Sequence, residues 1–152
     1  MVIRPANIYD IANLCTLAQQ FVIENKWDYT FSKENAERSF YNYMFSGETD
    51  VFVCDLDGVL VGFALVAIDV DFNNEKMGYV SKFYVCKEHR GKSIGRKLIE
   101  YCCEWFDKHG CVTSHATETG NIGENKLFSN LLKKYRYKFC GESLVRELNV
   151  KV

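Results

Sequence analysis

The segment between residues 78 and 106 constrains the fold most, because a strand, a short basic loop and a helix follow one another there. An apolar strand is expected over Gly78–Val85 and an amphipathic helix over Ile94–Phe106. In the loop that joins them, small residues let the main chain approach an anion, and the N–H groups of the first helical turn point toward it. Positive charge surrounds the same point, from Arg90, Lys92, Arg96 and Lys97. The segment therefore predicts a site for a pyrophosphate carried by a larger cofactor.

Length and composition narrow the class of protein. A chain of 152 residues with 47% hydrophobic and 14% aromatic residues predicts one globular domain over residues 1–152. A net charge of −1 gives no general attraction to nucleic acid or to a membrane surface. No apolar run approaches the length of a transmembrane helix, and the N-terminus lacks the pattern of a signal peptide.

The cysteines indicate a reduced, cytoplasmic protein. There are seven, an odd number, and no Cys-x-x-Cys pair occurs. His89, His109 and His115 have no metal-ligand spacing relative to them, so we expect no metal site.

Hydrophobic periodicity predicts an alternation of strands and helices along the whole chain. Strands are expected over residues 2–4, 50–55, 59–68, 77–85, 111–117 and 138–148, and helices over 11–22, 94–106 and 125–135, with a further helix that begins after Ser32. Ser32 is expected to cap that helix with its hydroxyl.

The loop resembles the acyl-coenzyme A loop of the GCN5-related N-acetyltransferases (GNAT), written Gln/Arg-x-x-Gly-x-Gly/Ala. Arg90, Lys92 and Gly95 sit as that pattern requires, whereas Ser93 stands where the family usually has its first glycine. We expect Ser93 to serve as the helix N-cap. The order of elements is also that of the family. Four shorter similarities to family motifs support the resemblance: Ile3–Ala6, Asp57–Phe63, Phe83–Val85 and Asn125. The resemblance implies the acyl-CoA N-acyltransferase fold, an α+β (α/β/α) sandwich with a mixed central sheet of six to seven strands and four helices.

By resemblance, the protein transfers an acetyl group from acetyl-CoA to a primary amine, by direct attack. The main chain of Phe83, Tyr84 and Val85 would align the pantetheine arm, with the N–H of Val85 directed at the acetyl carbonyl. The pyrophosphate would be bound by the N–H groups of Gly91, Lys92, Ser93, Ile94, Gly95 and Arg96, and Asn125 begins the last helix as it does in the family. The acceptor is a small molecule or a protein amino group, and the protein is a monomer or a homodimer.

The family's general acid, a tyrosine in the last helix, is absent. Leu132 takes its position, Tyr135 lies three residues further on, and Arg136 replaces the usual glycine. Tyr135 is a candidate acid, with packing as the alternative role.

The family's strand carboxylate is absent as well. Ser81 and Lys82 stand where many members have Glu or Asp, and Lys82 is interpreted as a solvated strand residue. The candidate bases that remain are Glu118, His115, Glu24 and Asp28.

The acceptor is expected to enter near residues 24–31. Trp27, Tyr29 and Phe31 are candidates for the walls of an apolar slot, with a hydrophobic staple between two helices as the alternative. A second loop carries Asp69, Asp71 and Glu75, whose charges predict attraction of a cationic amine.

Three classes of function stay open on the sequence. The first is an acetyl-CoA-dependent N-acetyltransferase. The second is a non-catalytic acyl-CoA-binding module, which the missing tyrosine and strand carboxylate favour. The third is a phosphate-loop protein that binds another nucleotide.

Overall fold

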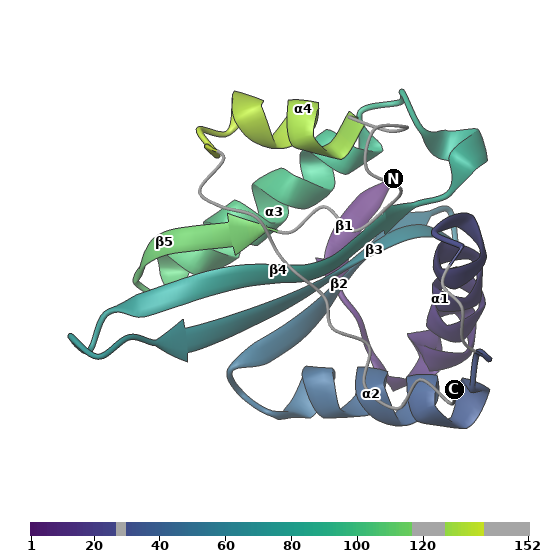
Figure 1. The fold of residues 1–152 in the computed structure, drawn as a ribbon. Helices are drawn as coiled ribbons and strands as arrows, with labels where there is room; N and C mark the ends of the chain where they lie inside the picture. The colour runs from purple at the N-terminus through teal and green to yellow at the C-terminus, as the bar shows by residue number, and fades with distance from the viewer. Residues whose placement is uncertain (27–29, 117–126, 139–152) are drawn as a thin grey trace, which may run out of the picture.

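A mixed five-stranded sheet forms the centre of the computed structural model, which describes residues 1–26, 30–116 and 127–138 (Figure 1). The strands lie in chain order: β1 (Val2–Pro5), β2 (Thr49–Leu56), β3 (Val59–Val70), β4 (Lys76–Val85) and β5 (Cys111–Ala116). Neighbouring strands are antiparallel except β4 and β5, which are parallel. The mixed sheet is confirmed, with five strands in the described ranges where six to seven were expected. The closing strand expected over 138–148 lies outside the described residues, apart from residue 138.

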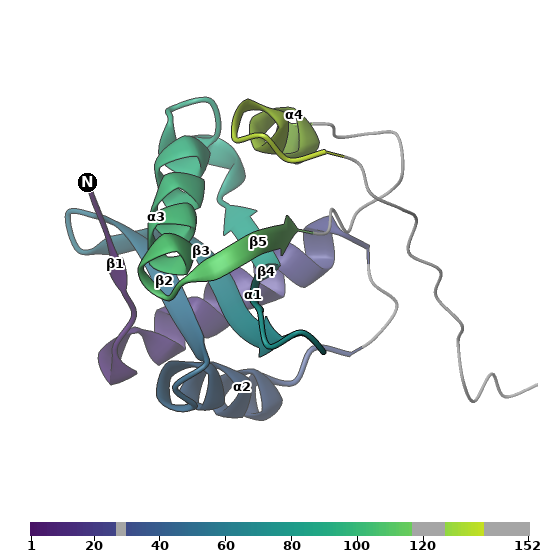
Figure 2. The ribbon, with the colours of Figure 1, turned by 90° about the vertical axis from the view of Figure 1, so that its left-hand side faces the viewer.

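Helices cover both faces of the sheet and confirm the α/β/α sandwich (Figures 1 and 2). One face carries α1 (Ile11–Glu24) and α2 (Lys33–Phe45), and the other carries α3 (Ile94–Lys108) and α4 (Leu127–Lys134). Short 3₁₀ turns, η1 (Ile8–Asp10) and η2 (Lys87–His89), precede α1 and follow β4. The predicted cap of α2 is confirmed, because the Ser32 hydroxyl accepts a bond of 3.2 Å from the N–H of Asn35. No helix in the described ranges has the length and apolar character needed to cross a bilayer.

The inner strands β2 and β3 supply side chains to a hydrophobic core on each face. Phe63 packs edge-on against Phe21 of α1 and Phe40 of α2, at ring-centroid distances of 6.3 and 5.8 Å. On the other face Phe52 lies 4.9 Å from the ring of Tyr101 in α3. Each fully buried ring of this kind stabilises the fold by about 1.5–3 kcal/mol. The packing makes the sheet centre a rigid support for β4.

Strand β4 is not paired in the same way along its whole length: its register with β3 shifts once, and β5 pairs with only its first half in the described part of the chain. The ladder between β3 and β4 shifts register between Leu65 and Val66, so that Ser81 is an extra residue on β4. The Ser81 hydroxyl donates a bond of 3.3 Å to the carbonyl of Leu65 at this bulge. The pairing with β5 spans Lys76 to Val80 only, within the described part of the chain. The last residues of β4 therefore extend past the described end of β5.

An ionic network joins the N-terminal strand to its neighbours. The Arg4 guanidinium donates two bonds to Asp10, of 2.7 and 3.0 Å, and two to Asp55, of 3.0 and 3.3 Å. Asp10 also accepts a bond of 2.8 Å from the N–H of Asn7. Bonding to Arg4 lowers the pKa of the Asp10 carboxyl below its usual value, in spite of its burial. The network fixes β1, η1 and β2 relative to one another.

We predict that Asp10→Asn lowers the free energy of unfolding by about 1–3 kcal/mol, because it leaves part of Arg4 unpaired. Because the folded pKa of Asp10 is depressed, its contribution is complete above about pH 4, the unfolded value, and is lost as the pH falls below that. Urea unfolding from pH 7 to pH 3 therefore shows a smaller loss for the variant than for the wild type. Asp57→Asn, in an exposed turn, is the matched control and is near neutral at both pH values. Equal acid sensitivity of wild type and Asp10→Asn would contradict the assignment.

Candidate functional site

The loop between β4 and α3 contains two residues with left-handed backbone. Gly91 has φ 77° and Ser93 has φ 65°. Glycine adopts this conformation freely, whereas a residue with a Cβ is strained there by about 1–2 kcal/mol. The Ser93 hydroxyl makes no cap bond to α3, so the expected side-chain cap is wrong. A capping side chain normally projects from extended backbone, and the left-handed turn at Ser93 directs it elsewhere.

The main-chain N–H groups from Gly91 through Arg96 have no acceptor among the described residues. The first bond into α3 is the one from Lys97 N–H to the Ser93 carbonyl, at 3.1 Å. Gly91, Lys92 and Ser93 are exposed, as is the side chain of Arg96. The positive end of a 15-residue helix dipole acts at the same point. The arrangement is chemically suited to an anion of the size of a diphosphate.

The end of β4 lies directly beside this loop. Val85 and Ile94 are both buried and belong to one apolar cluster. The bond from Cys86 N–H to the Val61 carbonyl, 2.9 Å long, sets the alternation of the antiparallel ladder. By that alternation Tyr84 bonds toward β3, and the N–H and C=O of Val85 point away from β3.

Arg90 is held by groups far from it in the sequence. Its Nε donates a bond of 2.9 Å to the Val85 carbonyl, and its terminal nitrogen pairs with the Glu24 carboxylate. Its guanidinium also lies 5.7 Å from the centre of the Tyr84 ring. The second Glu24 oxygen accepts a bond of 2.7 Å from the Tyr84 hydroxyl. Burial, and then that bond, raise the pKa of Tyr84 well above its usual value. Arg90 therefore joins α1 to the end of β4, and Glu24, a candidate base, has both oxygens engaged.

The structure keeps Tyr135 away from the end of β4. Its hydroxyl donates a bond of 2.6 Å to Glu100, which is seven residues, or about 10 Å, along α3 from Ser93. Burial and that bond raise the pKa of Tyr135 to about 12. Leu132, at the family's tyrosine position, is buried in the core beneath α3.

The remaining candidates are dispersed. His115 lies opposite Tyr79 and stacks on its ring at 5.2 Å, six residues or about 20 Å along β4 from Val85. The residues Trp27, Asp28, Tyr29, Glu118 and Asn125 lie outside the described part of the chain. The acidic residues 69, 71 and 75 lie where Val70 faces Lys76, at the opposite end of the hairpin from Val85 and about 30 Å away.

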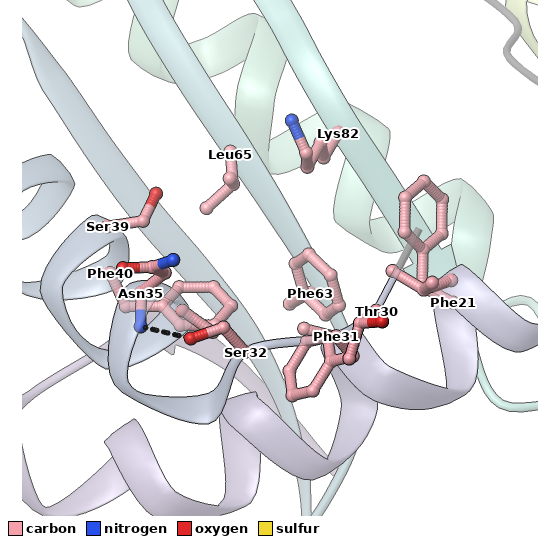
Figure 3. Close-up of a pocket in the computed structure, with 13 residues that line it drawn as sticks. Phe21, Thr30, Phe31, Ser32, Asn35, Ser39, Phe40, Phe63, Leu65 and Lys82 are labelled. Carbon is pink, nitrogen blue, oxygen red and sulfur yellow. Dashed lines mark hydrogen bonds between the residues drawn. The ribbon is translucent and has the colours of Figure 1, made fainter. Parts of the chain in front are cut away.

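A pocket of about 290 Å³ lies on the sheet face that α1 and α2 cover (Figure 3). Phe21, Phe31, Phe63 and Leu65 are among its apolar lining residues. Phe31 also packs against the core between α1 and α2, so both roles considered for it remain open. Lys82 lies at its edge on β4, a residue that the sequence indicated only as solvated. The alternation of side chains along a strand places Lys82 and Tyr84 on the same face, and this signal was present in the sequence. No cluster of metal-ligating side chains occurs within the described ranges.

Comparisons with known proteins agree with this geometry. A family model described as the acetyltransferase (GNAT) family matches residues 8–131. A curated relative from Archaeoglobus fulgidus, described as an uncharacterized N-acetyltransferase, is 32% identical over 83 residues, which cover 51% of this chain and 55% of the relative. The match thus spans about half the length of that relative.

Solved structures of low identity share the fold. Glucosamine-6-phosphate N-acetyltransferase from Arabidopsis thaliana superposes with a TM-score of 0.78 at 21% identity, covering 97% of this chain and 98% of that one. A predicted acetyltransferase with acetyl-CoA from Clostridium acetobutylicum gives 0.78 at 18% identity, over 98% and 96%. A ribosomal-protein-alanine N-acetyltransferase from Brucella melitensis gives 0.76 at 17% identity, over 97% and 100%.

We predict that Ser93→Gly raises the free energy of unfolding by roughly 0.5–1 kcal/mol, since it removes the left-handed strain at the cost of some chain entropy. Ser39→Gly, within α2, is the matched control and lowers stability by roughly 0.5 kcal/mol. Denaturant midpoints of the two variants test the difference. A loss of stability in both would show that the backbone at Ser93 is unstrained.

Proposed function

The chain belongs to the GNAT family of acetyltransferases, and on that premise we propose that it transfers an acetyl group from acetyl-CoA to a primary amine. The observation that carries the proposal is the row of N–H groups from Gly91 through Arg96 that have no acceptor among the described residues, on a helix start flanked by Lys92 and Arg96. This row suits the diphosphate of the cofactor, as the family resemblance implied. When bound, acetyl-CoA supplies a reactive thioester carbonyl, so the protein needs no covalent nucleophile.

The protein's own groups would position that carbonyl and the amine. The N–H of Val85 points away from β3 beside the loop, where it can donate to the acetyl oxygen. The neutral amine attacks the carbonyl carbon, the C–S bond breaks with its electron pair left on sulfur, and the amine loses one proton to solvent. An alkylamine with a pKa of about 10.4 is neutral in only about one molecule in a thousand near pH 7.4. Holding the amine in line is therefore a large part of the work.

The side chains that would move protons differ from the family pattern. Leu132 is buried where a tyrosine would act as general acid. Departure of the thiolate then depends on the low pKa of a thiol, about 8.5 for cysteine. We propose a reaction that proceeds without a general acid from α4, and therefore at a lower rate.

A second candidate is a non-catalytic acyl-CoA-binding module. The same burial of Leu132, and the presence of Ser81 and Lys82 in place of a strand carboxylate, favour it. It shares the cofactor site with the first candidate and differs only in thiol release.

We also propose a single domain over residues 1–152 and a cytoplasmic location. Cys15, Cys54, Cys86, Cys102, Cys103 and Cys111 are free, in keeping with a reducing compartment.

We predict that Arg96→Glu weakens acetyl-CoA binding at least about tenfold, because it places a like charge in the first turn of α3 beside the diphosphate. Lys108→Glu, at the other end of the same helix, makes the same change of charge and serves as the control, with little effect on binding. Isothermal calorimetry at low and moderate salt measures both. Thiol release over an amine panel then separates transfer from binding alone, and equal affinity of the two variants would contradict the cofactor site.

A further inference from the structure

The pocket on the α1 and α2 face opens beside the end of β4. Leu65, in its wall, lies opposite Lys82 in the ladder between β3 and β4. Lys82 precedes Val85 by three residues, or about 10 Å along the strand. An amine placed at the strand end can therefore extend its other groups into the pocket.

The charge that the described residues place at this pocket is positive. Lys82 is the one charged side chain among the described residues that line it. It is exposed and has no hydrogen bond or ion pair with any residue in the described ranges. The carboxylates nearby on the same face are compensated, since Glu24 pairs with Arg90 and Glu37 lies 3.8 Å from Lys33.

The acidic loop does not offset this charge. The residues 69, 71 and 75 lie at the far end of the hairpin, well beyond the Debye length of about 8 Å at physiological salt. A simple cationic amine approaching the pocket thus meets a like charge.

We propose that the acceptor is an amine bearing an anionic group, with an apolar side chain that fills the pocket, as in an apolar α-amino acid; this inference rests on the proposed acetyl transfer. Lys82 pairs with the anion and turns the amine toward the end of β4. The aromatic wall takes the apolar side chain, and a volume of about 290 Å³ limits it to a compact one. Lys82 stands where many family members have a strand carboxylate, and at that position it would recognise the anionic group of the acceptor.

The test compares amines that share an apolar group and differ in the carboxylate, with kcat/KM expressed per neutral amine because the carboxylate also lowers the amine pKa. Thiol release from acetyl-CoA is measured with L-phenylalanine against phenethylamine and with L-leucine against isoamylamine. The wild type is expected to favour the amino acid in kcat/KM by about tenfold, the usual effect of one charge-assisted bond. Lys82→Gln brings the ratio near one, and Lys82→Glu inverts it. Lys87→Glu, an exposed change in η2 outside the pocket, retains the wild-type ratio.

A ratio at or below one in the wild type, or one that Lys82 substitutions leave unchanged, would overturn the inference while acetyl transfer stands.

Binding of the products gives a readout that does not need turnover. N-acetyl-L-phenylalanine and N-acetylphenethylamine are titrated by NMR in the presence of coenzyme A. Tighter binding of the anionic product, with that preference lost in Lys82→Gln, supports the charge selection even if no amine releases thiol. Absence of thiol release with every amine would contradict only the proposed transfer. Equal binding of the two products, or binding of neither, would overturn the selection.

Discussion

The start of α3 carries main-chain N–H groups that have no acceptor among the described residues, and the rest of the site is arranged around them. Left-handed backbone at Gly91 and Ser93 turns the chain sharply into the helix. Ile94, the first residue of α3, is only 3% exposed and packs in one apolar cluster with Val85. The cluster that holds the helix start thus also holds the end of β4, so the proposed diphosphate site and the Val85 N–H are kept at a set separation.

Contacts of Arg90 extend this constraint to α1, because Arg90 bonds both Glu24 and Val85. Arg90 follows β4, yet its guanidinium pairs with the end of α1, and its Nε bonds the Val85 carbonyl. Tyr84 bonds the same carboxylate from the strand. Since α1 also lines the pocket, the geometry of the pocket and that of the strand end depend on one set of contacts. Arg90, which the sequence assigned to the anion loop, thus links α1 to the end of β4.

Local patterns were sufficient to predict the order of elements as far as α4, the Ser32 cap and the loop at α3, because each depends on neighbouring residues. Contacts between distant segments were not accessible. The pairing of Arg90 with Glu24 joins residues 66 positions apart, and the failure of Ser93 to cap depends on a backbone angle rather than on residue type. The position of Lys82 beside the pocket required the shifted register at Ser81 and the position of α2. The distance of the acidic loop from Val85 was likewise not accessible, since only the pairing of the hairpin shows it.

Backbone-amide NMR during a titration with acetyl-CoA tests the central claim most directly. The account predicts that the amides of Gly91 through Arg96 shift most and become protected from hydrogen exchange, together with the amide of Val85. Shifts that spare this row and fall elsewhere on the protein, or exchange that stays unchanged at saturating acetyl-CoA, would contradict it.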